Sequence, residues 1–371
     1  MALFGSQSRI QTDIMKTFSG LLLVALSSAA CANPVPTSMR EVVLTAVESG
    51  YEWKIIQAPV PVAGEHQVLV RVHAVSLNHG DLTRLHAKEV HEGFVPGTDA
   101  AGEVVALGKA VRGVHKGERV TSTYFKDWVD GPFSRKRLEH VPGWTADGVL
   151  ADYIVLADTD VIPIPAGMSY EEASTLPTAG LTAWNAIAGQ HKLRPSDVVV
   201  VQGTGGVSTF ALQFAVAGGA HVIVTSSSDD KLARAKTLGA RDGINYKAEP
   251  KWSEQVLQLT QGHGADLVMD IGGKATLDQS VASLADGGTL AVVGGMTGYD
   301  GTLSAWGLLE KAATAQTIFV GSNADYLRML AFMQAHHLHP LIEKTLPLQE
   351  YAEALRLLSA GQFMGKIVLT L

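Results

Sequence analysis

A run of four valines followed by a glycine-rich turn constrains the fold more than any other feature of this sequence. Val198–Val201 is a short stretch of β-branched residues, which is typical of a strand buried on both faces of a sheet. After Gln202 the chain continues as Gly203-Thr204-Gly205-Gly206-Val207-Ser208 and then enters a helical pattern. A strand that turns through glycines into a helix begins a βαβ unit of the dinucleotide-binding type.

The glycines of this turn suit the binding of a pyrophosphate group. Glycine permits the tight turn between strand and helix, and a side chain at the second glycine would block the approach of the phosphates to the backbone. The first N–H groups of the helix then face the phosphate oxygens. The third glycine of the usual pattern is Ser208 here, which is still small. The predicted pyrophosphate-binding residues are Gly203, Thr204, Gly205, Gly206 and Val207.

The end of the next strand predicts which nicotinamide cofactor is bound. An NAD-dependent enzyme places an acidic residue there to bind the ribose hydroxyls, but this chain has Thr225-Ser226-Ser227-Ser228 and no acid before Asp229. The hydroxyls of Ser226 and Ser227, together with Lys231, can bind a 2′-phosphate. Tyr246 can close the pocket, so the pattern favours NADPH over NADH. Alternatively, the serines only cap the helix that follows them.

Strands alternate with helices from about residue 198 to residue 294, whereas the part before residue 166 is rich in short strands and turns. This alternation predicts an α/β fold with a Rossmann-type, doubly wound parallel sheet beside a β-rich domain. The predicted divisions are a signal-like segment at 1–38, a substrate domain at 39–166, a dinucleotide-binding domain at 167–306 and a return to the substrate domain at 307–371. In the tail we expect a strand at 317–320, two helices and a final strand at 366–371.

Charge and cysteine content exclude several classes of function. The chain of 371 residues carries 29 basic and 36 acidic side chains, a net charge of −7, which gives no electrostatic footprint for nucleic acid. Cys31 is the only cysteine, so the chain has neither an internal disulfide nor a zinc site built on two thiolates. After residue 32 no apolar segment is long enough to span a bilayer. We therefore predict a small molecule as the binding partner.

The N-terminal segment has the order of a secretory signal peptide. Lys16 precedes an apolar stretch, Phe18 to Ala32, that ends in the small residues Ala30-Cys31-Ala32. At about 15 residues, this stretch is shorter than the roughly 20 that a membrane-spanning helix needs. Cleavage after Ala32 predicts a periplasmic or secreted protein. If translation instead starts at Met39, the protein is cytoplasmic.

The glycine turn and several further motifs resemble the medium-chain dehydrogenase/reductases, in the zinc-independent branch close to quinone oxidoreductases. The resemblance extends from about Met39 to Leu371. The further motifs are Ser76-Leu77-Asn78-His79-Gly80-Asp81, Pro96-Gly97-Thr98-Asp99-Ala100-Ala101-Gly102, Gly117-Glu118-Arg119-Val120, Leu176-Pro177, Leu181-Thr182-Ala183 and Gly365-Lys366-Ile367-Val368.

The resemblance implies a split architecture and a set of cofactor contacts. A GroES-like, partly open barrel holds the substrate, the Rossmann domain is inserted into it, and the tail returns to the first domain. A homodimer joined through edge strands of the nucleotide domains is also implied. By resemblance, Thr182 lies against the nicotinamide and its ribose, and Lys366 belongs to the cofactor site. Gly294 and Gly295 let the backbone approach the nicotinamide ring.

Residues that bind zinc in other branches of the family are replaced in this chain. Zinc-dependent members have cysteine at the position of Asn78, a His-Glu pair at Thr98-Asp99 and four clustered cysteines for a second, structural zinc. An asparagine cannot replace a thiolate as a zinc ligand. The spacing of His79, His86 and His91 fits no metal-binding motif. We therefore predict that the site holds no metal.

Without a metal, the chemistry that fits best is the reduction of a conjugated acceptor. Hydride adds to the β-carbon of an enone or to a quinone, and hydrogen-bond donors stabilise the negative charge that develops on oxygen. We predict Asn78 as that donor, with His79 or water as the proton source. Asp81 and Tyr124 complete the predicted catalytic residues, the carboxylate to hold the loop and the phenol as a further donor.

Two alternatives to this NADPH-dependent quinone or enone reductase stay open. One is an alcohol dehydrogenase that works without zinc and uses NAD or NADP. The other belongs to a different class, a nucleotide-binding or exported binding protein without catalytic activity. The second alternative gains weight if the signal peptide is cleaved, because nicotinamide nucleotides are scarce outside the cytoplasm.

Overall fold

The computed structural model describes residues 35–189 and 191–371, and Pro36–Leu371 belong to one structural unit. The predicted signal peptide and its cleavage site after Ala32 lie outside the described residues. In the described part of the chain, no helix has both the length and the apolar character that crossing a membrane requires.

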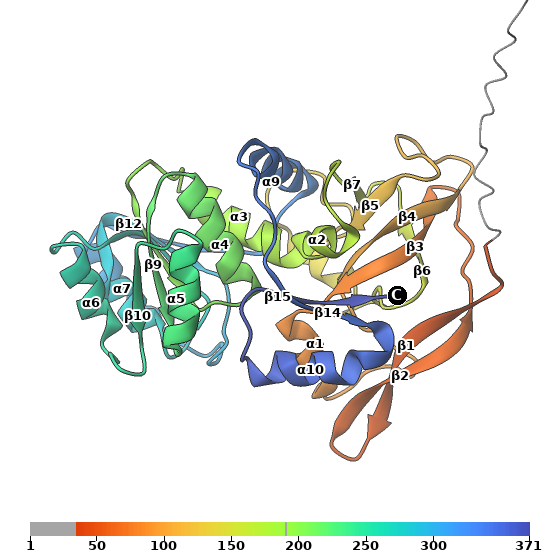
Figure 1. The fold of residues 1–371 in the computed structure, drawn as a ribbon, viewed down its shortest axis with the longest axis horizontal. Coiled ribbons are helices and arrows are strands. Elements are labelled where there is room, and N and C mark those ends of the chain that lie inside the picture. Colours follow the sequence, from red (N-terminus) through yellow and green to blue (C-terminus); the bar gives the residue numbers. More distant parts are fainter. Residues whose placement is uncertain (1–34, 190) are drawn as a thin grey trace, which may run out of the picture. The chain divides into compact units, whose positions relative to one another are not determined.

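Six parallel strands form the sheet that begins before the glycine turn (Figure 1). They are β8 Val198–Gln202, β9 His221–Ser226, β10 Asp242–Asn245, β11 Ala265–Asp270, β12 Leu284–Val292 and β13 Thr314–Thr317. Their order in the sheet is β10-β9-β8-β11-β12-β13. The predicted doubly wound parallel sheet is therefore confirmed. The strand order reverses between β8 and β11, and ligands of such sheets bind beyond the carboxyl ends of the strands at this switch point.

The consecutive valines of β8 show why this sheet is covered on both faces. The helices that cover it are α3 Leu181–Ala188, α4 Gly206–Ala217, α5 Asp229–Thr237, α6 Trp252–Leu259 and α7 Leu277–Ala282. Val199 and Val201 belong to a buried cluster with residues of α3, α4 and α5. Val200 belongs to a second buried cluster with residues of α6 and α7. Successive side chains of a strand point to opposite faces, so each face of β8 packs against its own layer of helices.

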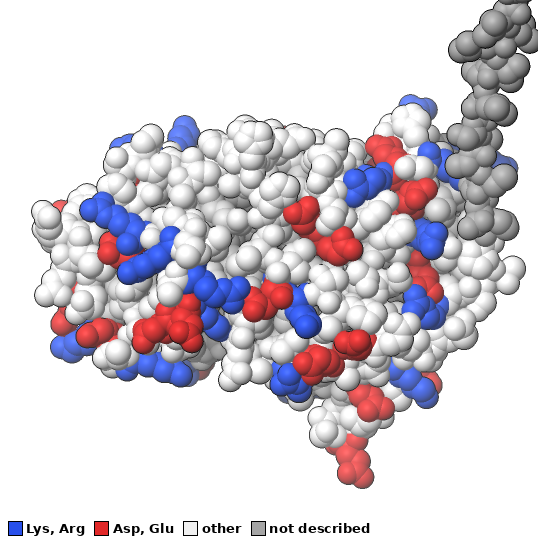
Figure 2. Space-filling view, viewed as in Figure 1, with Lys and Arg blue, Asp and Glu red and all other residues white. Residues whose placement is uncertain are grey.

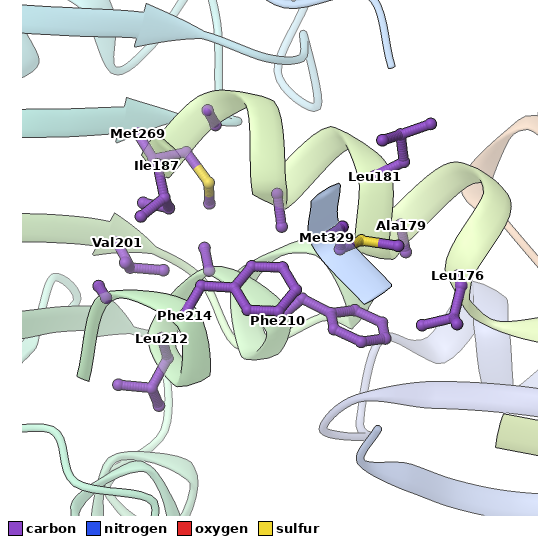
Figure 3. Close-up of a cluster of buried hydrophobic side chains, with 14 of the residues drawn as sticks. Leu176, Ala179, Leu181, Ile187, Val201, Phe210, Leu212, Phe214, Met269 and Met329 are labelled. Carbon is purple, nitrogen blue, oxygen red and sulfur yellow. The ribbon is translucent and has the colours of Figure 1, made fainter. Parts of the chain in front are cut away.

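Two phenylalanines of α4 connect this helix with its surroundings (Figure 3). The rings of Phe210 and Phe214 lie 5.8 Å apart, and both side chains are buried. In Figure 3, Val201 and Met269 of the sheet lie toward one end of this pair, and Met329 of α9 (Asn323–Ala335) lies toward the other. This packing fixes the position of α4, whose first turn belongs to the predicted cofactor site.

A second sheet combines strands from both ends of the described chain. Its order is β14-β15-β3-β4-β5-β7, with β6 also paired to β3. The strands are β3 Gln67–Ser76, β4 Asp99–Leu107, β5 Arg119–Ser122, β6 Tyr153–Ala157, β7 Val161–Pro163, β14 Ile342–Pro347 and β15 Lys366–Thr370. β15 runs antiparallel to β3, with Val368 opposite Ser76. The C-terminal strand thus completes the sheet of the first domain, as the resemblance implies.

The remaining elements surround these two sheets. A hairpin pairs β1 with β2. The elements are β1 Ser38–Val47, β2 Gly50–Pro59, α1 His79–Leu85, α2 Tyr170–Ser174, α8 Ala305–Glu310 and α10 Tyr351–Ala360.

The tail differs from its prediction in two places. The predicted strand at 317–320 is β13 at 314–317, which pairs with β12 and still belongs to the six-stranded sheet. The predicted return to the substrate domain at residue 307 is therefore too early. β14 was not expected, because most of its side chains are exposed and the strand has no continuous apolar run.

We expect Phe210→Ala to lower the free energy of unfolding by about 3–5 kcal/mol, because it removes a buried ring and leaves a cavity. Phe210 is 2% exposed. The control is Leu327→Ala on α9, where the side chain is 53% exposed, and it should change stability by no more than about 0.5 kcal/mol. Urea denaturation measures both values. Equal effects of the two substitutions would contradict the described core.

Candidate functional site

The glycine turn lies at the carboxyl end of β8, beside the switch point of the sheet. Gly203 has a φ of 76°, in the left-handed region that glycine adopts without strain. Gly205 directly precedes α4, and a Cβ built on it would meet no atom within 4 Å. This space and the N–H groups in the first turn of α4 suit an anionic group. The carbonyl of Thr204 accepts a hydrogen bond of 3.0 Å from the N–H of Gly365, which ties the turn to the tail.

Ser208 replaces the third glycine and anchors the helix. Its hydroxyl donates to the carbonyl of Gln202 at 2.7 Å, so the first turn of α4 is bound to the end of β8. A Cβ at Gly203 would lie 3.5 Å from this hydroxyl, which is ordinary contact. Val207, between these residues and the rest of α4, is half-buried. The small polar side chain of Ser208 therefore keeps the turn tight.

The predicted ribose-binding residues gather where β9 and β10 end. The N–H of Tyr246 donates to the carbonyl of Ser226 at 3.1 Å, and the Tyr246 side chain is 43% exposed. Ser227, the next residue after β9, is half-buried. The hydroxyl of Ser228 accepts from the N–H of Lys231 and caps α5, so one of the serines has the capping role of the alternative interpretation.

The ammonium of Lys231 is bound to the tail. It donates to the carbonyl of Gly361, just after α10, at 2.6 Å. Burial lowers the pKa of Lys231. To bind a 2′-phosphate, this ammonium has to exchange the Gly361 carbonyl for the phosphate or bind both.

A buried network fixes the loop that follows β11. Asp270 is fully buried and accepts hydrogen bonds from Gln202 Nε2 at 3.1 Å and from Ser280 Oγ at 2.5 Å. Gln202 Oε1 in turn accepts from the backbone N–H groups of Ile271 and Gly272, both at 3.2 Å. The carboxyl ends of β8 and β11 are therefore joined through side chains, directly at the switch point.

The loop after β12 packs against this segment with no room for side chains. A Cβ at Gly273 would lie 2.7 Å from the Cα of Gly295, and a Cβ at Gly294 would lie 3.0 Å from the carbonyl of Ile271. At Gly273, whose φ is 78°, glycine is therefore required for this contact between two backbones. Thr182, the remaining residue predicted to lie beside the nicotinamide, is buried in the first turn of α3.

Asn78 is held at three of its atoms on the substrate side. Its backbone N–H donates to Asp81 Oδ2 at 2.7 Å, which closes the start of α1. Its side-chain Nδ2 donates to Asp99 Oδ2 at 2.9 Å. Its Oδ1 accepts from Lys366 Nζ at 2.7 Å. Asn78 therefore joins α1 to the first residues of β4 and β15, and its own side chain is half-buried.

Burial changes the protonation of the charged groups around Asn78. It raises the pKa of Asp81 to about 6 and also raises the pKa of Asp99. It lowers the pKa of Lys366 to about 8, although both carboxylates favour the charged ammonium. Thr178 Oγ1 donates to Asp99 Oδ1 at 2.6 Å and supports the ionised carboxylate. At pH 7 the Lys366 ammonium is mostly charged.

The other two predicted catalytic residues differ in their relation to this network. The pKa of Tyr124 is raised by burial, and the charges of Asp99 and Asp81 raise it further. Tyr124 thus lies within electrostatic reach of the network as a protonated phenol. His79, in contrast, is exposed on the first turn of α1, and no hydrogen bond joins its ring to the residues that the structure describes.

Sequence reasoning missed several residues of the site. Thr178, Gln202 and Asp270 were not predicted, although all three take part in its hydrogen bonds. Polar residues at the ends of the apolar strands β8 and β11 are the signal that points to Gln202 and Asp270. Lys366 is predicted to belong to the cofactor site, and in the structure its ammonium binds Asn78 and the carbonyl of Leu77.

The donor set around Asn78 does not fit zinc. The group at its centre is a neutral amide, and the nearest cation is the ammonium of Lys366, which would repel a metal ion. Asp81 already closes α1, and Asp99 already binds Asn78 and Thr178. Within residues 35–189 and 191–371, no three His, Cys, Asp or Glu side chains form a group that could hold a metal ion.

Two segments of the chain match models of known protein families. Residues 206–335 match the family described as zinc-binding dehydrogenase, and residues 64–166 match the alcohol dehydrogenase GroES-like domain. A zinc-type alcohol dehydrogenase-like protein of Schizosaccharomyces pombe is 39% identical over 312 residues, which are 82% of this chain and 90% of that protein.

Solved structures agree with this result. A putative alcohol dehydrogenase from Sinorhizobium meliloti 1021 is 39% identical with a TM-score of 0.86, covering 91% of this chain and all of that one. An NAD-dependent alcohol dehydrogenase is 33% identical with a TM-score of 0.80, covering 90% of this chain and all of that one. The 2-octenoyl-CoA carboxylase reductase CinF, in complex with NADP and 2-octenoyl-CoA, shares the fold at 22% identity and a TM-score of 0.80. The chain therefore belongs to the medium-chain dehydrogenase/reductase superfamily and is an oxidoreductase with a GroES-like domain and a Rossmann domain.

Proposed function

We propose that this oxidoreductase uses NADPH to reduce quinones or α,β-unsaturated carbonyl compounds without a metal. The observation that carries this proposal is the amide of Asn78, which is bound by Lys366 and Asp99. By the family resemblance, zinc-dependent members have a thiolate at this position. Such a site offers a hydrogen-bond donor to an oxygen and no Lewis acid. The sheet, the glycine turn and the relatives support the oxidoreductase part of the proposal.

The residues of the turn and of the neighbouring loops fit a nicotinamide dinucleotide. Its pyrophosphate would lie over Gly205, against the first N–H groups of α4. Its nicotinamide end would then lie beside Thr182 and the loop of Gly294 and Gly295, at the switch point. The bound cofactor supplies a hydride ion, which is two electrons and one proton.

The side chains around Asn78 stabilise the charge that this hydride creates. The hydride's electron pair would form a C–H bond at the β-carbon. The π pair of the C=C bond would then become a double bond between the α-carbon and the carbonyl carbon, and the π pair of the C=O bond would move to the oxygen. The N–H of Asn78 donates to that oxygen, and protonation of the α-carbon by water completes the reduction. The phenol of Tyr124, with its raised pKa, stays protonated and can act as a further donor. His79 can pass a proton from solvent because it is exposed.

An alcohol dehydrogenase without zinc is the second candidate. The names of two relatives at 39% and 33% identity, a putative alcohol dehydrogenase and an NAD-dependent one, favour it. In this direction the same donors would bind the alcohol oxygen. The side chains around Asn78 argue against it, because an amide bound to an ammonium does not ionise an alcohol as zinc does.

A homodimer and a small-molecule substrate complete the proposal. β13 forms an edge of the six-stranded sheet, and Trp306 and Leu309 of the preceding helix α8 are 70% and 64% exposed. An apolar surface beside a free strand edge suits a second copy of the chain. On the face in Figure 2, basic and acidic side chains are interspersed, which suits a small substrate better than nucleic acid. If a signal peptide is cleaved after Ala32, the enzyme acts in the periplasm or is secreted.

One panel of assays tests the reaction class. NADPH with a naphthoquinone or a simple enone should lose its nicotinamide absorbance, and NADP⁺ or NAD⁺ with short alcohols should show little gain. Turnover of the alcohols alone would support the second candidate and reject the first. Turnover of neither class would reject both candidates.

We expect Gly205→Ala to weaken NADPH binding at least tenfold with little loss of stability. The new methyl group meets no protein atom, and it occupies the space where the pyrophosphate has to approach the backbone. Fluorescence titration measures the Kd, and thermal unfolding of the cofactor-free protein serves as the control, with a change of less than about 1 kcal/mol. An unchanged Kd would show that the phosphates bind elsewhere.

We expect Lys231→Ala to lower the ratio of kcat/KM for NADPH to kcat/KM for NADH about tenfold, since it removes the cation proposed to exchange the Gly361 carbonyl for the 2′-phosphate. Lys236→Ala, in the exposed last turn of the same helix, is the matched control and should leave the ratio unchanged. Steady-state rates with both cofactors give the ratio. If both variants keep the wild-type ratio, Lys231 does not bind the 2′-phosphate.

A further inference from the structure

The side chain of Lys366 runs from the cofactor turn to the substrate loop. Lys366 begins β15 and is 4% exposed. A Cβ on Gly206 would lie only 2.3 Å from Lys366 Cδ, so the stem passes directly over the first residue of α4. The ammonium then donates to the carbonyl of Leu77 and to Asn78 Oδ1. The Lys366 side chain therefore extends away from the glycine turn and toward the proposed donor, Asn78.

Lys366 and Asp99 together allow only one orientation of the Asn78 amide. An ammonium has donors and no acceptor, so it has to face the carbonyl oxygen Oδ1. An ionised carboxylate has only acceptors, so Asp99 has to face Nδ2. A rotation of the amide by 180° would place N–H groups against the ammonium and the carbonyl against the carboxylate. The amide is therefore fixed without any contact from a substrate.

This orientation leaves one N–H group of Asn78 for the substrate. Nδ2 carries two hydrogens, and Asp99 is the only acceptor bound to Nδ2 among the residues that the structure describes. Asn78 is half-buried as a residue, so it is not sealed inside the core. The Lys366 ammonium donates to the carbonyl oxygen of Asn78 and draws electron density from the amide nitrogen. The remaining N–H is therefore a stronger donor.

We propose that Lys366 is the positioning residue of this site: its buried ammonium fixes and polarises the amide of Asn78, and so provides the cation that a metal provides in zinc-dependent relatives. This inference rests on the proposed role of Asn78 as the donor to the substrate oxygen. It differs from the predicted role of Lys366 in cofactor binding, because it assigns the effect of the lysine to the chemical step.

A double-mutant cycle tests the proposal. The variants are Lys366→Met, which keeps the stem and removes the charge, Asn78→Ala, and the two combined. If Lys366 acts through Asn78, each single variant should lose about 100-fold in kcat, and the double variant should lose no more than the worse single one. The Kd for NADPH of Lys366→Met should stay within about threefold of wild type. Lys344→Met, on the exposed side of the neighbouring strand β14, is the matched control and should keep wild-type kcat.

The dependence of kcat on pH is a second measurement, and a purely structural role of Lys366 would not change it. The charged groups facing the ammonium are the carboxylates of Asp81 on α1 and Asp99 on β4. The wild-type kcat should fall as the pH rises through about 8, where the ammonium loses its proton. Lys366→Arg keeps its charge at high pH, so it should retain part of the activity and lose this alkaline limb. Lys366→Met should have a low kcat with no such limb.

Three results would overturn the proposal. The first is wild-type kcat in Lys366→Met. The second is a loss confined to the Kd for NADPH, which would return Lys366 to the cofactor site. The third is a double variant whose loss is the product of the two single losses. If Lys366→Met does not fold, Lys366→Arg and its pH profile decide, and an unchanged alkaline limb there counts against the proposal.

The cycle also separates this inference from the proposed function. It is measured with whichever substrate class the wild type converts. If alcohols are the only substrates, the proposed enone or quinone reduction fails, but coupling between Lys366 and Asn78 would still show that the ammonium acts through the amide.

Discussion

The buried ammonium of Lys366 determines how the two halves of the site meet. It comes from the last strand and binds a residue 288 positions earlier, in the loop before α1. A charge that leaves water needs close partners, and Asn78, Leu77 and the carboxylates of Asp81 and Asp99 supply them. Those partners belong to α1, to β4 and to the loop between β3 and α1. These segments therefore have to assemble together around the lysine.

The same end of β15 also positions the cofactor turn. The N–H of Gly365 binds the carbonyl of Thr204, and the stem of Lys366 crosses Gly206. Two adjacent residues thus contact the glycine turn and the proposed donor. This explains the glycine at 206 in a way that the dinucleotide-binding pattern alone does not, because a Cβ there would collide with the lysine before any cofactor is bound. The glycine turn and Asn78 therefore both contact the same two-residue segment, Gly365-Lys366.

Sequence patterns could predict the parts of this arrangement that depend on neighbouring residues. The alternation of Val199, Val200 and Val201 and the glycine turn are local, so the parallel sheet and the position of α4 followed from them. The partner of Lys366 could not be predicted, because it depends on the antiparallel pairing of β15 with β3. The position of β13 along the chain was also not predicted correctly. It is an edge strand with both ends exposed, so its sequence shows little apolar periodicity.

The magnitudes of oxyanion stabilisation support our proposal of conjugated acceptors, rather than alcohols, as substrates. Zinc lowers the pKa of bound water by about 9 units, which corresponds to about 12 kcal/mol in favour of the oxyanion. One oriented hydrogen-bond donor contributes about 3–4 kcal/mol. Alcohol oxidation has to remove the proton of an unactivated hydroxyl before or during hydride loss, and the amide of Asn78 falls well short of that requirement. In an enone the carbonyl oxygen gains its charge from the hydride itself, and the charge is shared with the α-carbon. In the proposed mechanism, a donor polarised by Lys366 meets that smaller requirement.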